Sequence, residues 1–181
     1  NLEFSPKDVV LFGFGRIGRL VARELIKQAG KGQQLRLKGI VVRNISNEQM
    51  IKRCDLFRND SVHGAYKADI DLNLKEKCLT VNGQRIYFIE GKNHSEINYN
   101  KYGINDALLI DNSGAFTDKD SLSNHLESTG ISKVLLTAPG KGIPNIVYGI
   151  NSKELDIENS KIVSAASCTT NCIAPILHVI E

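Results

Sequence analysis

The residues from Gly13 to Gly18, "GFGRIG", constrain the fold of this chain more than any other stretch. They follow the apolar run Val9 to Phe12, typical of a buried strand, and precede "LVARELIKQAG", a helical pattern with Gly30 as its stop signal. Between a strand and a helix, the first glycine permits a tight turn, the second lets a pyrophosphate approach the backbone, and the third lets helix and strand pack closely. The free N–H groups at the helix start suit phosphates. This context predicts dinucleotide binding.

Buried strands alternate with helices along the rest of the chain. Further strands are predicted at Leu37 to Val42, Ala107 to Ile110, "KVLL" and "KIVSAA". Helices are predicted from about Asn47, capped by Ser46 or Asn47, and from Thr117, the expected N-cap, to Gly130. Asn82-Gly83, between two β-rich runs, predicts a hairpin within residues 68–90. The pattern predicts an α/β fold of Rossmann type, a doubly wound, mostly parallel sheet with an antiparallel hairpin insertion.

Composition and charge exclude several classes of function. The 181 residues suit one domain of ordinary size, and the net charge is only +3, with Lys and Arg scattered among Asp and Glu. We therefore expect no nucleic-acid partner and no membrane contact, and no secretion signal is visible, which favours a cytoplasmic protein. Cys54 and Cys78 are expected to be buried free thiols. The C-x-x-x-C spacing of Cys168 and Cys172, with no second Cys/His cluster, predicts no metal site.

The second strand ends in "VVRNIS", where a dinucleotide fold usually carries an acidic residue for the ribose of NAD. No carboxylate appears before Glu48. Arg43 could pair with the 2′-phosphate of NADP, or it could simply be an exposed arginine at a strand end. The residues alone therefore predict NAD or NADP without choosing between them.

Cys168 lies in "SAASCTTNCIAP", between an apolar strand pattern and a helical one. We expect it in the first turn of that helix, where the N-terminus favours a thiolate, which is a good nucleophile toward a carbonyl carbon. Ser167, Thr169 and Thr170 bring hydroxyl groups suited to an anion. The same residues also suit an ordinary helix cap beside a small buried cysteine, and both interpretations stay open. Cys172, one turn further on, is expected to pack against other residues.

The cysteine motif makes the sequence recognisable. With "FGFGRIGR", "NDSVHG" (Asn59 to Gly64), "DNSGAF" (Asp111 to Phe116) and "LTAPGKG" (Leu136 to Gly142), it closely resembles the phosphorylating glyceraldehyde-3-phosphate dehydrogenase family over nearly the whole chain. The resemblance implies a tetrameric, NAD(P)-dependent oxidoreductase, with a Rossmann domain followed by a catalytic domain. It would oxidise glyceraldehyde 3-phosphate, with inorganic phosphate, to 1,3-bisphosphoglycerate through a cysteine thiohemiacetal and thioester.

The resemblance also implies roles for individual residues. Cys168 would be the nucleophile, and Ser167 and Thr169 would bind substrate or the attacking phosphate. The implied cofactor-binding residues are Gly13, Phe14, Gly15, Arg16, Ile17, Asn44, Ser113, Gly114, Thr137 and Ala138. Ile45 stands where the family usually has Asp, so we expect NADP to be at least tolerated.

The family carries a histidine base some distance beyond the cysteine, and no residue here matches it. His178 lies ten residues after Cys168, which is about 15 Å along a helix, too far for proton transfer. His63, in "NDSVHG", is interpreted as structural, and nothing marks His94 or His125 as catalytic. We therefore expect residues 1–166 to form the NAD(P)-binding Rossmann domain and residues 167–181 to begin a catalytic domain that is largely absent. The alternatives are an enzyme that acts on another phosphorylated aldehyde, such as erythrose 4-phosphate, and a catalytically inert nucleotide-binding module.

Overall fold

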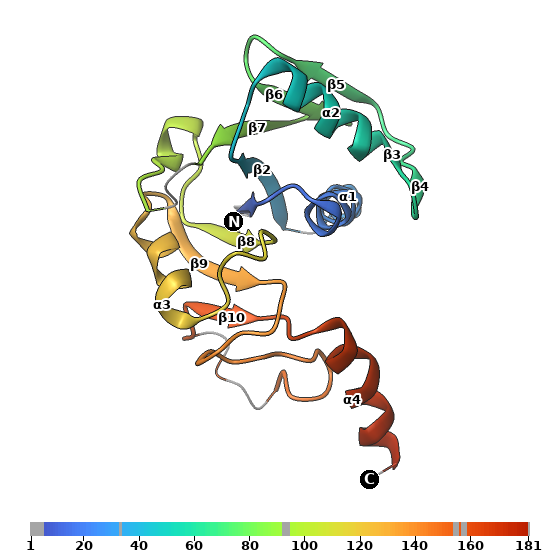
Figure 1. The fold of residues 1–181 in the computed structure, drawn as a ribbon, viewed down its shortest axis with the longest axis vertical. Coiled ribbons are helices and arrows are strands. Elements are labelled where there is room, and N and C mark those ends of the chain that lie inside the picture. The colour runs from blue at the N-terminus through green and yellow to red at the C-terminus, as the bar shows by residue number, and fades with distance from the viewer. Residues whose placement is uncertain (1–5, 33, 92–94, 154–155, 157–158, 181) are drawn as a thin grey trace, which may run out of the picture.

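A central parallel sheet organises the molecule. The computed structural model describes residues 6–32, 34–91, 95–153, 156 and 159–180, and its main sheet has eight strands in the order β10-β9-β8-β1-β2-β7-β6-β5 (Figure 1). They are β1 (Lys7–Phe12), β2 (Leu35–Val42), β5 (Ile70–Asn73), β6 (Cys78–Val81), β7 (Gln84–Glu90), β8 (Ala107–Asp111), β9 (Ile131–Leu136) and β10 (Ile162–Ser164). From β10 to β7 all neighbours run parallel, whereas β5, β6 and β7 pair antiparallel. The predicted Rossmann-type sheet and its antiparallel insertion are therefore confirmed.

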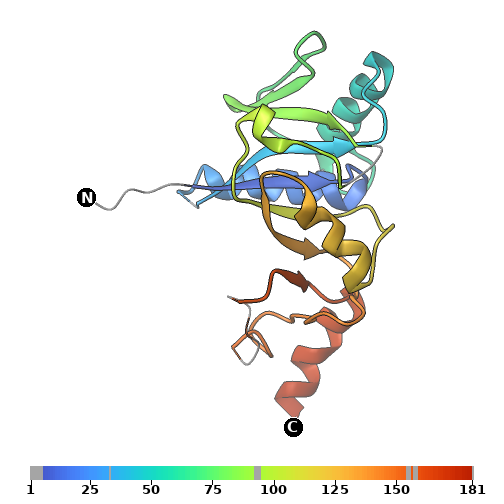
Figure 2. The same cartoon turned by 90° about the vertical axis from the view of Figure 1, so that its left-hand side faces the viewer.

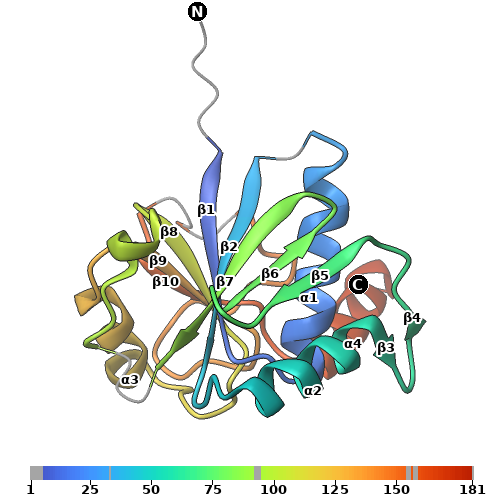
Figure 3. The ribbon, with the colours of Figure 1, turned by 90° about the horizontal axis from the view of Figure 1, so that it is seen from above.

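Helices cover both faces of this sheet. Helices α1 (Arg16–Ala29) and α2 (Asn47–Arg58) lie on one face, whereas η1 (Tyr99–Tyr102), α3 (Lys119–Ser123) and η2 (Asn124–Glu127) lie on the other (Figures 1 and 3). A small ladder of β3 (Asn59–Asp60) and β4 (Gly64–Ala65) follows α2. Figure 2 shows α4 (Cys168–Ile180) extending away from the sheet beyond β10.

Strand β1 joins the two layers of the core. Val9 and Leu11 pack in the cluster on the side of α1 and α2, whereas Val10 packs in the cluster on the opposite face, and all three side chains are fully buried. Successive side chains of a strand point to opposite faces, so a strand covered on both sides must be apolar throughout. The run "VVLF" meets that requirement.

Turn and cap residues set the element boundaries. Asn82 and Gly83 both have positive φ, 49° and 80°, as a two-residue hairpin turn requires, so the predicted hairpin is confirmed. Ser46, one of the two expected caps of α2, accepts a hydrogen bond from the Gln49 N–H at 3.4 Å. The prediction of Thr117 as an N-cap was wrong. Asp118 caps α3 instead, because its carboxylate accepts the Ser121 N–H at 3.0 Å.

Candidate functional site: a dinucleotide cleft beside a cysteine turn

The expected site segments gather at one edge of the sheet. The glycine loop follows β1, Arg43 and Asn44 follow β2, and Ser113 and Gly114 lie just after β8. Thr137 follows β9, and Cys168 comes shortly after β10. These five strands are parallel neighbours, so their carboxyl ends lie on the same edge. Strand β1 lies between β2 and β8, where the chain order reverses. Such a point is where open α/β sheets bind ligands.

The three glycines of the loop meet different surroundings. Gly13 has φ +95°, and a Cβ there would lie 3.0 Å from the Ser113 backbone nitrogen. A Cβ on Gly18 would lie inside normal contact distance of the Gly13 carbonyl oxygen, so this glycine lets α1 pack against the end of β1. A Cβ on Gly15, the N-cap of α1, would meet nothing within 4 Å. The space over Gly15 therefore suits close approach of a pyrophosphate to the backbone.

A cleft of about 510 Å³ opens at the same point, within the range typical of small-molecule sites. Its lining comprises Phe12, Gly13, Phe14, Gly15, Val41, Val42, Arg43, Arg53, Gly91, Asn112, Ser113, Ala115 and Phe116. The first turn of α1 has no acidic residue, and no side chain of the described chain caps it. The first turn of α1 thus presents N–H groups and a partial positive charge, with no acidic side chain of its own. The described residues fit a dinucleotide phosphate.

Four of the expected cofactor-binding residues line this cleft, namely Gly13, Phe14, Gly15 and Ser113. The Phe14 side chain is buried and packs against Phe57, with ring centroids 5.6 Å apart, so we expect its backbone to face a cofactor. The others lie on the same edge, outside the lining that the structure describes: Arg16, Ile17, Asn44, Gly114, Thr137 and Ala138. Thr137 and Ala138 form hydrogen bonds within the fold. The Thr137 hydroxyl donates to the Asp111 carbonyl oxygen, and the Ala138 carbonyl oxygen accepts the Ser164 hydroxyl.

The end of β2 presents arginines and no acidic residue. Arg43 is exposed and lines the cleft, whereas Asn44 accepts the Ser46 N–H through Oδ1 at 2.7 Å. Ile45 is half-buried and packs against the core. The sequence analysis overlooked Arg53, a cleft residue on α2. Helical spacing was the available signal, because Arg53 lies seven residues after the N-cap Ser46, two helical turns along the same face.

A buried contact between a histidine and a carboxylate supports the far wall of the cleft. Asp111, at the end of β8, accepts the Ser113 N–H through Oδ1 at 2.7 Å, and its Oδ2 lies 3.0 Å from His125 Nε2. Both side chains are fully buried, and His125 also packs on Phe12, with ring centroids 4.7 Å apart. This contact fixes the Asn112–Ser113 turn that lines the cleft. Sequence reasoning had found no role for His125.

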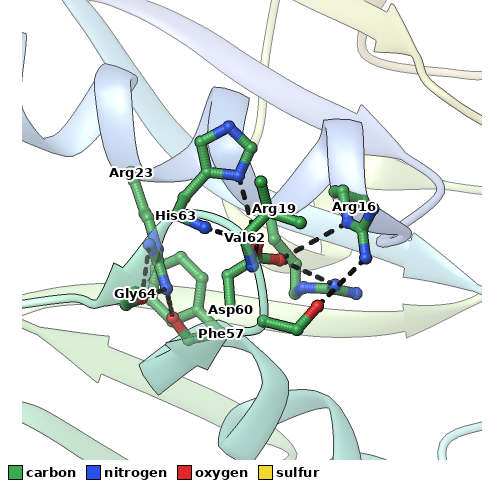
Figure 4. A network of polar contacts seen from close by, with 9 residues as sticks. Arg16, Arg19, Arg23, Phe57, Asp60, Val62, His63 and Gly64 are labelled. Carbon is green, nitrogen blue, oxygen red and sulfur yellow. Dashed lines mark hydrogen bonds and ion pairs between the residues drawn. The ribbon is translucent and has the colours of Figure 1, made fainter.

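The "NDSVHG" segment clamps the start of α1 (Figure 4). The Asp60 carboxylate, buried to 2% exposure, accepts the N–H groups of Val62 and His63 and pairs with Arg19 at 3.4 Å. Arg16 lies 3.7 Å from the same carboxylate. The His63 and Val62 N–H groups hold the pKa of the Asp60 carboxyl well below its usual range. His63 Nδ1 lies 3.1 Å from Asp60, which suits the structural role predicted for it.

The backbone is strained just before Cys168. Cys168 begins α4 and is exposed, and Ala166, two residues earlier, has φ +57°, a conformation uncommon for residues other than glycine. The Ser167 hydroxyl accepts the Thr170 N–H at 2.9 Å and lies 2.9 Å from the Thr169 hydroxyl. Ser167 therefore caps the helix, and the hydroxyl groups of Ser167, Thr169 and Thr170 cluster in the same helical turn as the exposed Cys168.

The other cysteines divide by burial. Cys54 and Cys78 are buried free thiols, as predicted, and burial raises the pKa of both. The expectation that Cys172 would pack was wrong for the chain as described. It is exposed, because α4 extends beyond the sheet and has no buried residue.

Among the described residues, no cluster of three or more His, Cys, Asp or Glu could hold a metal ion. None of their helices is long and apolar enough to cross a membrane.

Comparison with known proteins decides the family. Residues 7–119 match the sequence model of the glyceraldehyde 3-phosphate dehydrogenase NAD-binding domain. The chain belongs to the glyceraldehyde-3-phosphate dehydrogenase family. It is therefore part of an oxidoreductase family, and the match confirms the prediction of a nicotinamide dinucleotide, NAD or NADP, as cofactor.

Similar proteins extend the likeness beyond the matched domain. A glyceraldehyde-3-phosphate dehydrogenase-like protein of Pseudomonas aeruginosa is 49% identical over 96% of this chain and 38% of its own length. The glyceraldehyde-3-phosphate dehydrogenase of Chlamydia muridarum is 34% identical over 95% of this chain and 48% of its own length. A cytosolic glyceraldehyde-3-phosphate dehydrogenase of Antirrhinum majus is 37% identical over 98% of this chain and 49% of its own length. The chain thus spans half or less of each of these relatives.

Proposed function

We propose that this chain forms the cofactor-binding part of a dehydrogenase that converts glyceraldehyde 3-phosphate and inorganic phosphate to 1,3-bisphosphoglycerate with NAD or NADP. The observation that carries the proposal is the exposed Cys168 at the start of α4, on the sheet edge that also holds the glycine-loop cleft. The names of the relatives support the same substrate. We place the boundary between the Rossmann domain and a catalytic domain after Ala166.

In the proposed reaction, the Cys168 thiolate adds to the aldehyde carbon and forms a thiohemiacetal, and the carbonyl oxygen takes up a proton. A bound nicotinamide would supply the acceptor for the hydride on this carbon. Loss of the hydride and of the hydroxyl proton leaves a thioester on Cys168. A phosphate oxygen then attacks the thioester carbon, which releases the acyl phosphate and restores the thiolate. The hydroxyl groups of Ser167 and Thr169 would bind the substrate or the attacking phosphate.

The base that removes the hydroxyl proton is proposed to lie outside these 181 residues. His178 stands on α4 about 15 Å from Cys168 along the helix axis. His63 is tied to Asp60, and His125 is buried against Asp111. His94 lies outside the described residues. We further propose a homotetrameric, cytoplasmic enzyme, in keeping with the resemblance of the sequence.

The test uses Cys168→Ser in the full-length protein, with Cys172→Ser as the matched control on the same helix. We expect Cys168→Ser to abolish phosphate-dependent NADH or NADPH formation from glyceraldehyde 3-phosphate and to leave cofactor binding, measured by calorimetry, unchanged. Cys172→Ser should retain turnover. Normal turnover by Cys168→Ser would contradict the proposed mechanism, and failure of the folded protein to bind either cofactor would contradict the proposed function.

A further inference from the structure

Two arginines from different parts of the chain line the nucleotide cleft. Arg43 is exposed at the end of β2, and Arg53 is half-buried on α2, the helix that follows. Both line the cleft that contains Gly13 and Gly15. In dinucleotide folds the end of the second strand faces the adenosine ribose. By this general rule, Arg43 and Arg53 line the part of the cleft where the ribose of a bound dinucleotide is expected.

The charge at this end of the cleft is not balanced by a carboxylate. Arg43 and Arg53 are the only charged residues among the described residues of the lining. Neither forms an ion pair with any carboxylate in the described part of the chain. Ile45, where the family usually has Asp, packs its side chain against the core. A neutral 2′-hydroxyl would leave both positive charges without a counter-ion.

The geometry of Arg53 suits an anion. Its Nη1 lies 3.1 Å from the Gln49 carbonyl oxygen and 3.0 Å from Gln49 Oε1, so this nitrogen can donate one hydrogen to each acceptor. A guanidinium has five N–H donors, so Nε and Nη2 keep three for a ligand. The contacts with Gln49 also hold the side chain in place. Burial lowers the pKa of Arg53, and a neighbouring phosphate would offset that loss of solvation.

We propose that Arg43 and Arg53 together bind the 2′-phosphate of NADP and make NADP the preferred cofactor of this chain. The inference rests on the proposed dinucleotide function and goes beyond tolerance of NADP. Planar guanidinium groups match phosphate oxygens in a bidentate manner. The half-buried side chain of Arg53 is held in place on α2 and would contact the phosphate from that helix. The side chain of Arg43, which follows β2, is exposed and can move to contact the same phosphate.

The experiment is calorimetric titration of the full-length protein with NADP, NAD, 2′,5′-ADP and 5′-AMP. The last two probes separate the 2′-phosphate from the rest of the cofactor. We compare Arg43→Gln, Arg53→Gln and the double variant with Lys52→Gln, which removes the same charge from the same helix at an exposed position outside the cleft lining described. Thermal unfolding of each variant monitors folding. Arg43→Gln alters only an exposed side chain and keeps the test valid if Arg53→Gln unfolds.

We expect NADP to bind more tightly than NAD, and 2′,5′-ADP more tightly than 5′-AMP. Each arginine substitution should weaken NADP and 2′,5′-ADP binding by about tenfold or more, because a charge-assisted contact is lost, and should change NAD binding by less than about twofold. Lys52→Gln should bind all four probes as the parent does. Equal binding of NAD and NADP, or equal losses in Lys52→Gln and Arg43→Gln, would overturn the inference but not the dinucleotide function. Absence of binding by both cofactors to folded protein would overturn both.

Discussion

Gly15 and Gly18 belong to the same glycine motif but have different functions, and adding a single methyl group at each position would distinguish these functions. We predict that Gly15→Ala changes the free energy of unfolding by no more than about 1 kcal/mol, because its φ of −73° suits alanine and a Cβ there meets nothing within 4 Å. The same methyl group would weaken NAD(P) binding by about tenfold or more by filling the space that a pyrophosphate needs.

Gly18→Ala is the matched control, since its Cβ would press on the Gly13 carbonyl oxygen. We expect it to destabilise the fold by about 1–3 kcal/mol. Chemical denaturation and calorimetry give both quantities. If Gly15→Ala binds NAD(P) as tightly as the parent does, the space over Gly15 is not the place of the pyrophosphate.

The four cysteines allow reactivity to be compared within one molecule. We predict that iodoacetamide labels Cys168 first at neutral pH, ahead of Cys54 and Cys78, whose burial raises their pKa. Cys172 is the sharper comparison, because it is also exposed on α4 but lies one turn beyond the helix start. Peptide mapping after a short pulse provides the measurement. Equal labelling of Cys168 and Cys172 would mean that the position at the helix start does not raise the reactivity of Cys168 above that of any exposed cysteine.

Among elements, α1 depends on the "NDSVHG" segment through Asp60. The pKa of the Asp60 carboxyl group is lower in the folded chain than in the unfolded chain. In acid the unfolded state therefore binds more protons, and the contribution of Asp60 to the stability of the fold is lost as the pH falls. We predict that Asp60→Asn lowers the Tm at pH 7 and that its deficit relative to the parent shrinks from about pH 5 downward. Asp55→Asn, at an exposed ion pair on α2, is the control and should show little change at either pH. A deficit of constant size down to pH 3 would show that the charge of Asp60 is not what matters.

Local signals predicted some element boundaries better than others. Asn82-Gly83 identified its hairpin because the turn type itself requires residues that adopt positive φ. The cap of α3 was predicted one residue early because Thr117 and Asp118 are both good caps, and only the position of the Ser121 N–H distinguishes them. Periodicity also suggested one helix as far as Gly130, whereas the chain tightens to a 3₁₀ turn at Asn124.

For the whole molecule, alternation of buried strands and helices was enough to predict the sheet, because each parallel strand must be apolar on both faces. The glycine loop likewise followed from its place between β1 and α1. Arg53 could not be assigned in this way, since it lies on α2 and lines the cleft beside the end of β1 only in the folded chain. The pair of Asp111 and His125 was equally hidden, because its partners come from β8 and η2, fourteen positions apart.

The central position of β1 has a consequence for how the chain is made. Val9 pairs with Leu37 on one side and with Leu108 on the other, so the second edge of this strand stays unpaired until more than a hundred residues have left the ribosome. An apolar strand with an open edge is prone to pair with other chains during that interval. Lys7 and Asp8 precede its apolar core, and Arg16 and Arg19 follow soon after. Charges that flank an apolar strand in this way discourage aggregation before the native partner arrives.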